Sequence, residues 1–239
     1  MVELQGARVL LRDKRVSDAE QDYIWRSDHE LARLDAAYPL TMNYDRYVKI
    51  FQDQLRYPTP GSHHFGIDVS DGKSDGKSDG KSDDKSSGNS DVESDGNFMG
   101  KFIGNCMYYD LDSINREAEL GIVIGDRDYW SGAYGYDAVV TLLDYMFTER
   151  NLKRVYLHTL QWNDRAQKCF SKCGFNLVRE VRRMGQDFLL MEVLRDDWFQ
   201  SAEQCLAARW DYLHQKGGEA IHREDAPPVA SPSSSVTDS

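Results

Sequence analysis

The sequence predicts an α+β domain with one mixed central sheet of about seven strands, flanked by helices. Short apolar and β-branched runs alternate with helical patterns in the order β-α-α-β-β-β-α-β-α-β-β. The chain has 239 residues, of which 40% are hydrophobic, and this content is sufficient for a packed core. We expect a single domain over residues 1–215, a disordered insertion at 70–97 between the second and third strands, and a disordered tail at 216–239.

The first predicted elements precede the insertion. The apolar run "ARVLLRD" at 7–13 predicts a strand, and Ser17 and Glu20 stand at capping-box spacing before a helix through residue 31. A second helix is predicted at 45–57, where apolar residues recur at helical spacing and prolines follow. The run "HHFGIDV" predicts the next strand.

The insertion at 70–97 repeats Ser, Asp, Gly and Lys and contains almost no apolar residue. Such a segment cannot bury enough surface to offset its ordering entropy, so we expect a flexible surface loop joining two strands. Aspartates recur every four residues, whereas a calcium-binding EF-hand loop needs ligands at alternate positions. The four cysteines form no Cys-x-x-Cys pair. We therefore expect reduced thiols and no metal site.

The remaining elements follow the insertion. The pattern predicts strands at 98–112, 116–124 and 153–161, helices at 130–151 and 163–174, a hairpin at 175–194, and a last helix at 196–216.

Charge and hydropathy narrow the class of protein. The formal net charge is −11, which argues against a nucleic-acid-binding surface, since such surfaces normally carry a basic stripe. No segment reaches the roughly 18 consecutive apolar residues of a membrane helix, and the N-terminus has no apolar signal-peptide core. We therefore expect a cytoplasmic protein without nucleic-acid or membrane partners.

The stretch "YWSGAYGYDA" at 129–138 is the main functional motif. A strand that ends in a glycine-containing turn and opens a helix presents backbone N–H groups at the positive end of the helix dipole, which favours a pyrophosphate. A dinucleotide-binding G-x-G-x-x-G would stand early in a β-α-β unit, but three strands precede this loop. A P-loop would require a lysine after the second glycine, and none is present.

This motif and three others resemble the GNAT superfamily of N-acetyltransferases, and within it the RimJ/RimL-like branch of ribosomal-protein N-terminal and spermidine acetyltransferases. The branch motif Tyr-Trp-Gly-x-Gly-Tyr-Gly-x-Glu-Ala is similar to "YWSGAYGYDA", and "REAELGIVI", "NDRAQKCFSKCGF" and "LLMEVLRDDW" resemble the branch in the same order. The resemblance implies the GNAT acyl-CoA N-acyltransferase fold, with acetyl-CoA (coenzyme A) as cofactor. It also implies that the fourth and fifth predicted strands splay apart around the pantetheine arm.

The resemblance assigns cofactor contacts to the fourth strand, to the loop after it and to the helix opened by Asn163, whose other interpretation is a helix N-cap. These residues are Ile122, Val123, Ile124, Trp130, Ser131, Gly132, Ala133, Tyr134, Gly135, Asn163, Ala166 and Phe170.

Two of these positions depart from the family pattern. Ala133 replaces the usual first glycine, and we expect the neighbouring Gly132 to take the unusual backbone angle. Phe170 stands where many relatives have a tyrosine that protonates the departing thiolate. The thiolate then leaves unassisted, or Tyr108, Tyr109 or a water supplies the proton.

Three residues are candidates for catalysis. The resemblance indicates Glu119 as the general base acting through water, and the alternative is an ion pair with a basic neighbour such as Arg154. His158 is the second candidate base, and the backbone N–H of Val123 would polarise the thioester carbonyl. The expected reaction is acetyl transfer to a primary amine, either a protein N-terminus or a small molecule, by direct attack in a ternary complex.

Two other functions and the oligomeric state stay open. The fold could serve an acyl-CoA-binding sensor or non-catalytic protein, or an interaction module that works through the acidic repeat and the tail. A homodimer is also compatible with the sequence.

Overall fold

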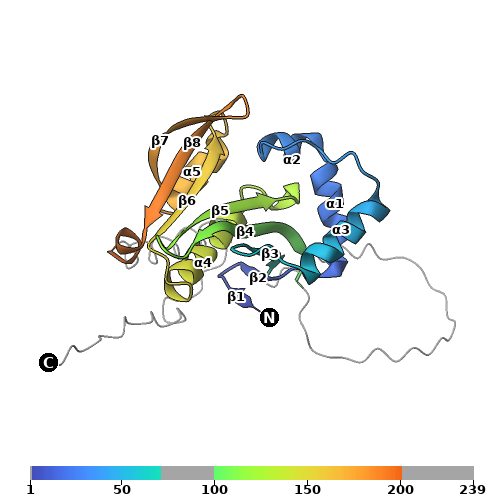
Figure 1. The fold of residues 1–239 in the computed structure, drawn as a ribbon, viewed down its shortest axis with the longest axis horizontal. Coiled ribbons are helices and arrows are strands. Elements are labelled where there is room, and N and C mark those ends of the chain that lie inside the picture. Colours follow the sequence, from blue (N-terminus) through green and yellow to red (C-terminus); the bar gives the residue numbers. More distant parts are fainter. Residues whose placement is uncertain (1, 71–99, 201–239) are drawn as a thin grey trace, which may run out of the picture.

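The computed structural model of the chain describes residues 2–70 and 100–200, and residues 1, 71–99 and 201–239 lie outside the described part. The described strands form one sheet of eight in the order β1-β2-β3-β4-β5-β6-β8-β7 (Figure 1). The strands are β1 (Glu3–Gln5), β2 (Val9–Asp13), β3 (His63–Val69), β4 (Phe102–Asp112), β5 (Glu117–Ile124), β6 (Arg154–Leu160), β7 (Asn176–Arg183) and β8 (Gln186–Leu194). The α-helices are α1 (Ala19–Ser27), α2 (His29–Leu34), α3 (Tyr44–Arg56), α4 (Tyr134–Thr148) and α5 (Asp164–Lys172).

The predicted mixed α+β sheet is confirmed, but it has one strand more than expected. The extra strand, β1, pairs with β2 through Glu3↔Arg12 and is only three residues long, which is too short to give a sequence pattern. With β1 counted, the insertion predicted at 70–97 joins β3 and β4 rather than the second and third strands. Apart from Ser70, the insertion lies outside the described residues, as do most of the predicted last helix and the tail.

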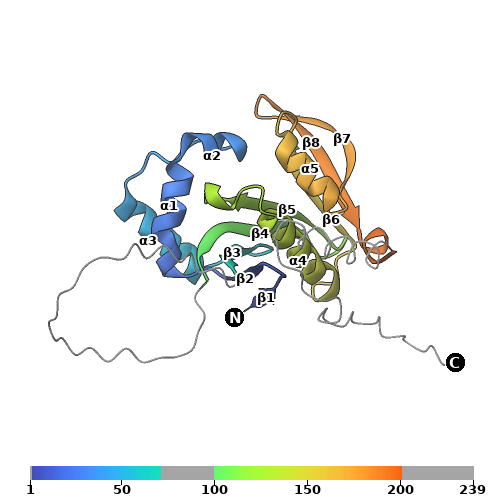
Figure 2. The ribbon, with the colours of Figure 1, turned by 180° about the vertical axis from the view of Figure 1, so that it is seen from behind.

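Helices cover the sheet on both faces. Figures 1 and 2 show α4 and α5 on one face, and α1, α2 and α3 grouped on the other side of the molecule. α4 is the central helix because most of its side chains are buried, and Leu142, Leu143 and Met146 are fully enclosed. On the opposite face, Trp25 of α1 packs against Phe102 of β4 with ring centroids 5.0 Å apart.

The helix predicted through residue 31 is broken at Asp28. Its extended backbone ends α1, and its carboxylate accepts hydrogen bonds from the backbone N–H groups of Glu30 and Leu31, which starts α2. Nor does the expected capping box form at Ser17: the N-cap of α1 is Asp18, whose carboxylate makes no capping hydrogen bond to α1 and instead binds the guanidinium of Arg12 at 2.8 Å. The break directs α2 away from α1 and across the end of β5 (Figure 1).

The parallel pair β5 and β6 stays together only at one end. The strands pair from Glu117↔Arg154 to Glu119↔Tyr156, and no pairing continues beyond Glu119. On its other edge β5 pairs with β4 as far as Ile124. Among the described residues, β5 therefore has an open edge from Leu120 onward, and the predicted splay of these two strands is confirmed.

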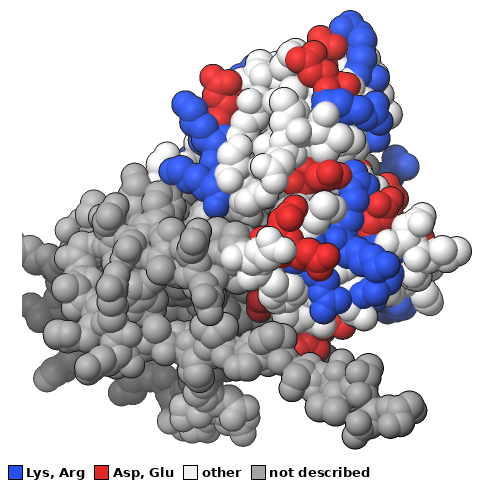
Figure 3. Space-filling view, turned by 90° about the vertical axis from the view of Figure 1, so that its left-hand side faces the viewer, with Lys and Arg blue, Asp and Glu red and all other residues white. Residues whose placement is uncertain are grey.

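β7 is an edge strand of the sheet, and its Leu177 and Val178 side chains are exposed to solvent. Figure 3 views the molecule from this side. Lys and Arg side chains alternate there with Asp and Glu side chains around an uncharged area, and the described residues on this face form no continuous basic stripe.

Candidate active site

A cleft of ≈ 320 Å³ begins at the open edge of β5. One wall comes from α2, and the other comes from α5 together with the loop that opens α4. The residues along it are Leu31, Leu34, Asp35, Ile122, Val123, Ile124, Tyr129, Trp130, Ser131, Ala133, Gly135, Tyr136, Asn163, Arg165, Ala166, Lys168, Cys169, Phe170 and Lys172. The cleft therefore joins the two regions that the sequence singled out, the 129–138 loop and the helix after Asn163.

The loop that opens α4 contains two residues with left-handed backbone. Ser131 has φ +63°, and Ala133, the N-cap of α4, has φ +67° and ψ 2°. Gly132 has no positive φ, so the expectation that it would take the unusual angle in place of Ala133 is wrong. Alanine itself adopts the strained conformation, and its methyl group is buried in the core.

The two glycines of the loop are needed for different structural reasons. A Cβ added at Gly132 would lie 2.7 Å from the Tyr134 ring, so this glycine allows the ring to pack closely. A Cβ at Gly135 would meet within 4 Å only the Ile124 side chain, at 3.6 Å. Because Gly135 lines the cleft, its missing side chain leaves room there.

Most of the predicted cofactor contacts lie along the cleft. Gly132 and Tyr134 are the two that do not line it. Asn163 is the N-cap of α5, where its side chain accepts a hydrogen bond from the N–H of Ala166, and it also faces the cleft. Phe170 is buried against Phe175, with ring centroids 5.9 Å apart, and its ring carries no proton to give.

Sequence reasoning missed the basic side of α5. Arg165, Lys168 and Lys172 recur at helical spacing, and all three line the cleft beside Cys169. The guanidinium of Arg165 also lies 3.7 Å from the ring centroid of Trp130. The spacing of these three basic residues in the sequence already indicated a common face, because residues three and four positions apart lie on the same side of a helix. Cationic side chains in this position favour an anionic ligand such as the phosphate groups of coenzyme A.

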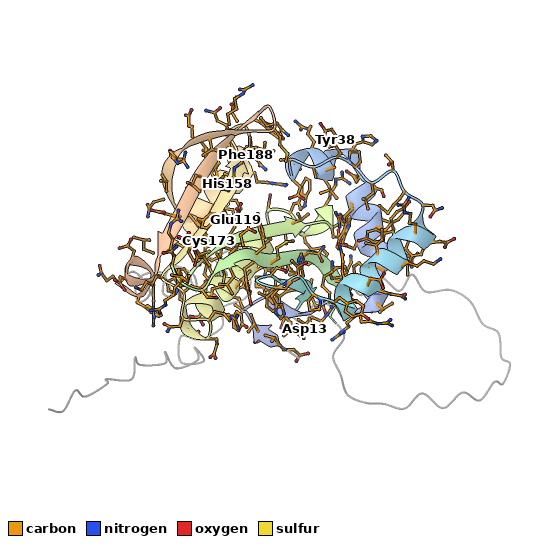
Figure 4. The ribbon with its side chains drawn as sticks, in the orientation of Figure 1. Asp13, Tyr38, Glu119, His158, Cys173 and Phe188 are labelled. Carbon is orange, nitrogen blue, oxygen red and sulfur yellow. The ribbon has the colours of Figure 1, made fainter. Side chains whose placement is uncertain are left out.

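The two candidate bases form one pair. The Nδ1 atom of His158 on β6 lies 2.7 Å from Oε1 of Glu119 on β5, and both side chains are 7% exposed. Figure 4 shows the two side by side on the sheet, facing the space between α2 and the β7–β8 hairpin. An Nδ1–H that donates to the carboxylate leaves Nε2 of His158 as a proton acceptor.

Arg154, the basic neighbour named as an alternative partner for Glu119, binds other carboxylates. Arg154 binds Glu117 at 2.8 Å and Glu192 at 2.6 Å, not Glu119. On its other side Glu119 faces Tyr109, its neighbour across β4 and β5. Burial, and then the Glu119 carboxylate, raise the pKa of the Tyr109 phenol, so Tyr109 stays protonated at neutral pH. Tyr108, the other tyrosine considered as a proton donor, is buried in the hydrophobic core.

The cleft also carries Asp35, at the end of α2. Desolvation by the surrounding protein raises the pKa of Asp35 to about 6, and the charge of Arg26 opposes this shift. Asp35 is therefore mostly ionised at neutral pH and adds negative charge to that of Glu119.

The described residues contain no group of three or more His, Cys, Asp and Glu side chains that could hold a metal ion. None of the described helices has the length and apolar character needed to cross a membrane.

The sequence matches a known family. The family described as acetyltransferase (GNAT) domain matches residues 8–176. The chain therefore belongs to the GNAT acetyltransferase family, whose members use acetyl-CoA as acetyl donor.

Two curated relatives match part of this sequence. Spermidine N(1)-acetyltransferase of Vibrio cholerae is 31% identical over 100 residues, which are 39% of this chain and 57% of the relative. An uncharacterized N-acetyltransferase, p20, of Bacillus licheniformis is 40% identical over 83 residues, which are 34% of this chain and 46% of the relative. The chain spans about half the length of these curated relatives.

Solved structures share the fold at low sequence identity. Spermidine N-acetyltransferase from Vibrio cholerae in complex with CoA and spermine has a TM-score of 0.61 and 16% identity, covering 81% of this chain and 99% of that chain. A probable acetyltransferase has a TM-score of 0.64 and 18% identity, covering 83% and 99%. A GNAT acetyltransferase from Bacillus anthracis has a TM-score of 0.59 and 13% identity, covering 82% and 99%.

The residues present fit coenzyme A. The open edge of β5 offers backbone groups to an extended chain, as an added strand would require. Gly135 leaves room where α4 begins, and a helix start favours a phosphate group. The basic residues of α5 supply positive charge to the same cleft.

Proposed function

We propose that this chain transfers the acetyl group of acetyl-CoA to a primary amine of a small cationic molecule, by direct attack in a ternary complex. One observation carries the proposal: the buried Glu119–His158 pair stands on the sheet next to the point where β5 and β6 separate and the cleft begins. Acyl donor and proton acceptor would thus meet at one place on the sheet.

The catalytic roles follow from this arrangement. Bound acetyl-CoA would supply a thioester carbonyl for the amine to attack. The expected donor, Val123, turns its N–H towards Asn105 of β4, because Gly125 donates to Ile103 and backbone groups alternate along the strand. The N–H of a neighbouring residue on the open edge, Ile122 or Ile124, would therefore polarise that carbonyl. The Glu119–His158 pair would remove a proton from the ammonium form of the substrate, directly or through water, because a protonated amine is not nucleophilic. Glu119 would hold the imidazole of His158 in the tautomer that accepts this proton.

The cofactor contacts are part of the same proposal. The backbone of Ile122, Val123 and Ile124 would bind the pantetheine arm, and the start of α4 together with Asn163 would bind the pyrophosphate. Arg165, Lys168 and Lys172 would attract the remaining phosphate.

A small cationic acceptor is favoured by the charge of the acceptor side. Glu119 and Asp35 are both carboxylates, and the Asp35 carboxylate lies in the cleft. The relatives named for spermidine support the same class of substrate. A protein N-terminus would need less negative charge, since it carries only one cationic group.

The acceptor class is tested by measuring thiol release from acetyl-CoA in the presence of an amine panel. The panel should contain spermidine, spermine, a monoamine and N-terminal peptides. We expect turnover with the polyamines and at least tenfold lower kcat/KM with the monoamine and the peptides. Equal or faster turnover with peptides would refute the small-molecule assignment, and no turnover with any amine would refute the transfer itself.

Phe170 favours a second candidate, an acyl-CoA-binding sensor. A phenylalanine cannot protonate a leaving thiolate, so α5 offers no proton donor at this position. Calorimetry that shows acetyl-CoA binding, combined with no thiol release across the panel, would support this alternative.

We also propose that the chain is RimJ/RimL-like, cytoplasmic and a single domain over residues 1–215, and that it forms a homodimer. The four motifs support the branch, the absence of a long apolar run supports the location, and exposed Leu177 and Val178 on the edge strand β7 support self-association.

A further inference from the structure

Arg8 contacts the loop that opens α4 and does not line the cleft. It precedes β2 and is only 9% exposed. Its Nη1 donates a hydrogen bond of 2.6 Å to the carbonyl oxygen of Gly132, and its Nη2 donates one of 3.2 Å to the Tyr134 hydroxyl. The guanidinium carbon also lies 4.4 Å from the Tyr134 ring centroid. The Arg8 side chain thus contacts both residues that flank Ala133 in the sequence.

These contacts fix the orientation of one peptide group. No peptide bond among the described residues is cis, so the C=O of Gly132 and the N–H of Ala133 point in opposite directions. Arg8 binds the carbonyl on one side, which turns the Ala133 N–H to the other. Ala133 lines the cleft and Gly132 does not, in agreement with this orientation.

Arg8 is itself held by α4. The carboxylate of Asp137, which is completely buried, accepts hydrogen bonds from the backbone N–H groups of Arg8 at 2.7 Å and Val9 at 3.2 Å. α4 therefore anchors Arg8, and Arg8 in turn orients the loop from which α4 begins. Such mutual bracing keeps the left-handed Ala133 in place, because a strained residue persists only where its surroundings determine it.

We propose that Arg8 is a positioning residue for the pyrophosphate of the acetyl donor. It aims the N–H of Ala133 into the cleft and adds a positive charge behind the loop, without contacting the ligand. The inference rests on the proposed function only in taking coenzyme A as the ligand. Its distinctive consequence is that the effect of Arg8 depends on the pyrophosphate and not on the pantetheine arm or the 3′-phosphate.

Calorimetry with three ligands tests this inference. Coenzyme A and dephospho-coenzyme A both contain the pyrophosphate, and pantetheine does not. We expect Arg8→Met to weaken the binding of the first two ligands by about tenfold each, equivalent to about 1.4 kcal/mol. Pantetheine binding should change by less than twofold. Arg8→Lys keeps the charge but lacks the planar fork, so it should weaken both nucleotide ligands by about threefold.

The controls separate this effect from misfolding. Arg46→Met removes an arginine whose side chain is exposed on α3 and should leave all three affinities unchanged. If Arg8→Met does not fold, Arg8→Lys carries the test. Equal weakening of pantetheine, or no weakening of coenzyme A in folded Arg8 variants, would overturn the inference. A wild type that binds coenzyme A but acetylates no amine would refute the proposed function and leave the Arg8 inference standing.

Discussion

Glu119 and His158 lie 39 positions apart in the sequence, and their side chains meet at 2.7 Å. Both residues were predicted from the sequence, but as alternatives to each other. The parallel register of β5 and β6, in which Glu119 lies opposite Tyr156, brings them together. Strand register across a crossover is set by packing of the intervening helix, so no local pattern could have shown that the two candidates form one unit.

The pair makes a prediction at the scale of the residue. Glu119→Gln should lower kcat by about 10²-fold or more, because the amide cannot stabilise the imidazolium that forms at His158. His158→Gln should have a similar effect, and the double variant should be little worse than either single one. The measurement is kcat against pH with the best amine of the panel.

Glu117→Gln is the matched control for this experiment. Glu117 lies two residues earlier on β5, and its carboxylate binds Arg154 rather than His158. The variant should keep kcat within about threefold of the wild type, since Glu117 faces no group of the proposed machinery. Equal loss in Glu117→Gln and Glu119→Gln, or additive losses in the double variant, would contradict the assignment of a functional pair.

Other residue-level features were only partly predictable. Ala133 was recognised as unusual from the sequence, but the left-handed angle was assigned to Gly132, since a glycine tolerates that angle more easily. The structure shows why alanine takes it: Gly132 is needed for contact with the Tyr134 ring, and Arg8 holds the carbonyl between the two residues. The role of Arg8 depends on contacts with residues more than a hundred positions away, which sequence reasoning cannot supply.

At the scale of the element, the start of α4 depends on the left-handed backbone of Ala133. We expect Ala133→Val to lower the free energy of unfolding by about 2 kcal/mol or more, because a β-branched residue is a rare outlier at positive φ. Ala133→Gly should change it by no more than about 1 kcal/mol, since relief of strain offsets the lost methyl burial and the added chain entropy.

Urea denaturation of the three proteins gives the measurement. The two substitutions at one position serve as controls for each other, because both change the same side chain in opposite directions. If Ala133→Val were as stable as the wild type, the backbone angle at the start of α4 would be wrong.

Most elements follow from their sequence patterns, and the exceptions share a cause. α3 and β5 were predicted to within about one residue of their observed bounds because their apolar periodicity is strong, and α4 was predicted too long at both ends. On β5, Ala118, Leu120 and Ile122 face the core as alternation requires, and Glu119 faces the opposite side. The break at Asp28 was missed because polar residues continue on both sides of it, so the helical pattern does not change there.

At the scale of the whole molecule, the segment at 71–99 joins two strands that are already paired. Asp68 of β3 lies opposite Phe102 of β4, and the N–H of Val69 donates to the carbonyl oxygen of Lys101 at 2.9 Å. The ends of the segment are therefore adjacent in space. A hairpin loop of a few residues is enough to connect neighbouring antiparallel strands.

Deletion of residues 71–95 should consequently leave both folding and catalysis nearly intact. The deletion leaves a four-residue connection, Gly96 to Met99, between Ser70 and Gly100. We expect a free energy of unfolding within about 1 kcal/mol of the wild type, since loop shortening changes closure entropy only slowly. The KM for acetyl-CoA should change by less than twofold. A loss of soluble protein or of turnover would show that the segment contributes to structure or function.

The overall architecture was predictable, whereas the site was predictable only as separate parts. Element order and four motifs indicated the GNAT fold, because the fold needs a fixed succession of strands and helices. The way α2 crosses the end of β5, and the placement of Asp35 on the cleft, depend on packing between distant elements. In the proposed function these contacts favour a cationic acceptor, which the sequence left undetermined.

The open edge of β5 has a practical consequence for handling the protein. An unpaired strand edge with its N–H and C=O groups exposed is the kind of surface through which chains associate into aggregates. Here such an edge lies inside the sheet, beside the separation of β5 and β6, rather than at its protected rim. A ligand that lies along this edge would act as a protective cover as well as a reactant. Preparations that contain coenzyme A should therefore stay soluble at concentrations where the empty protein precipitates.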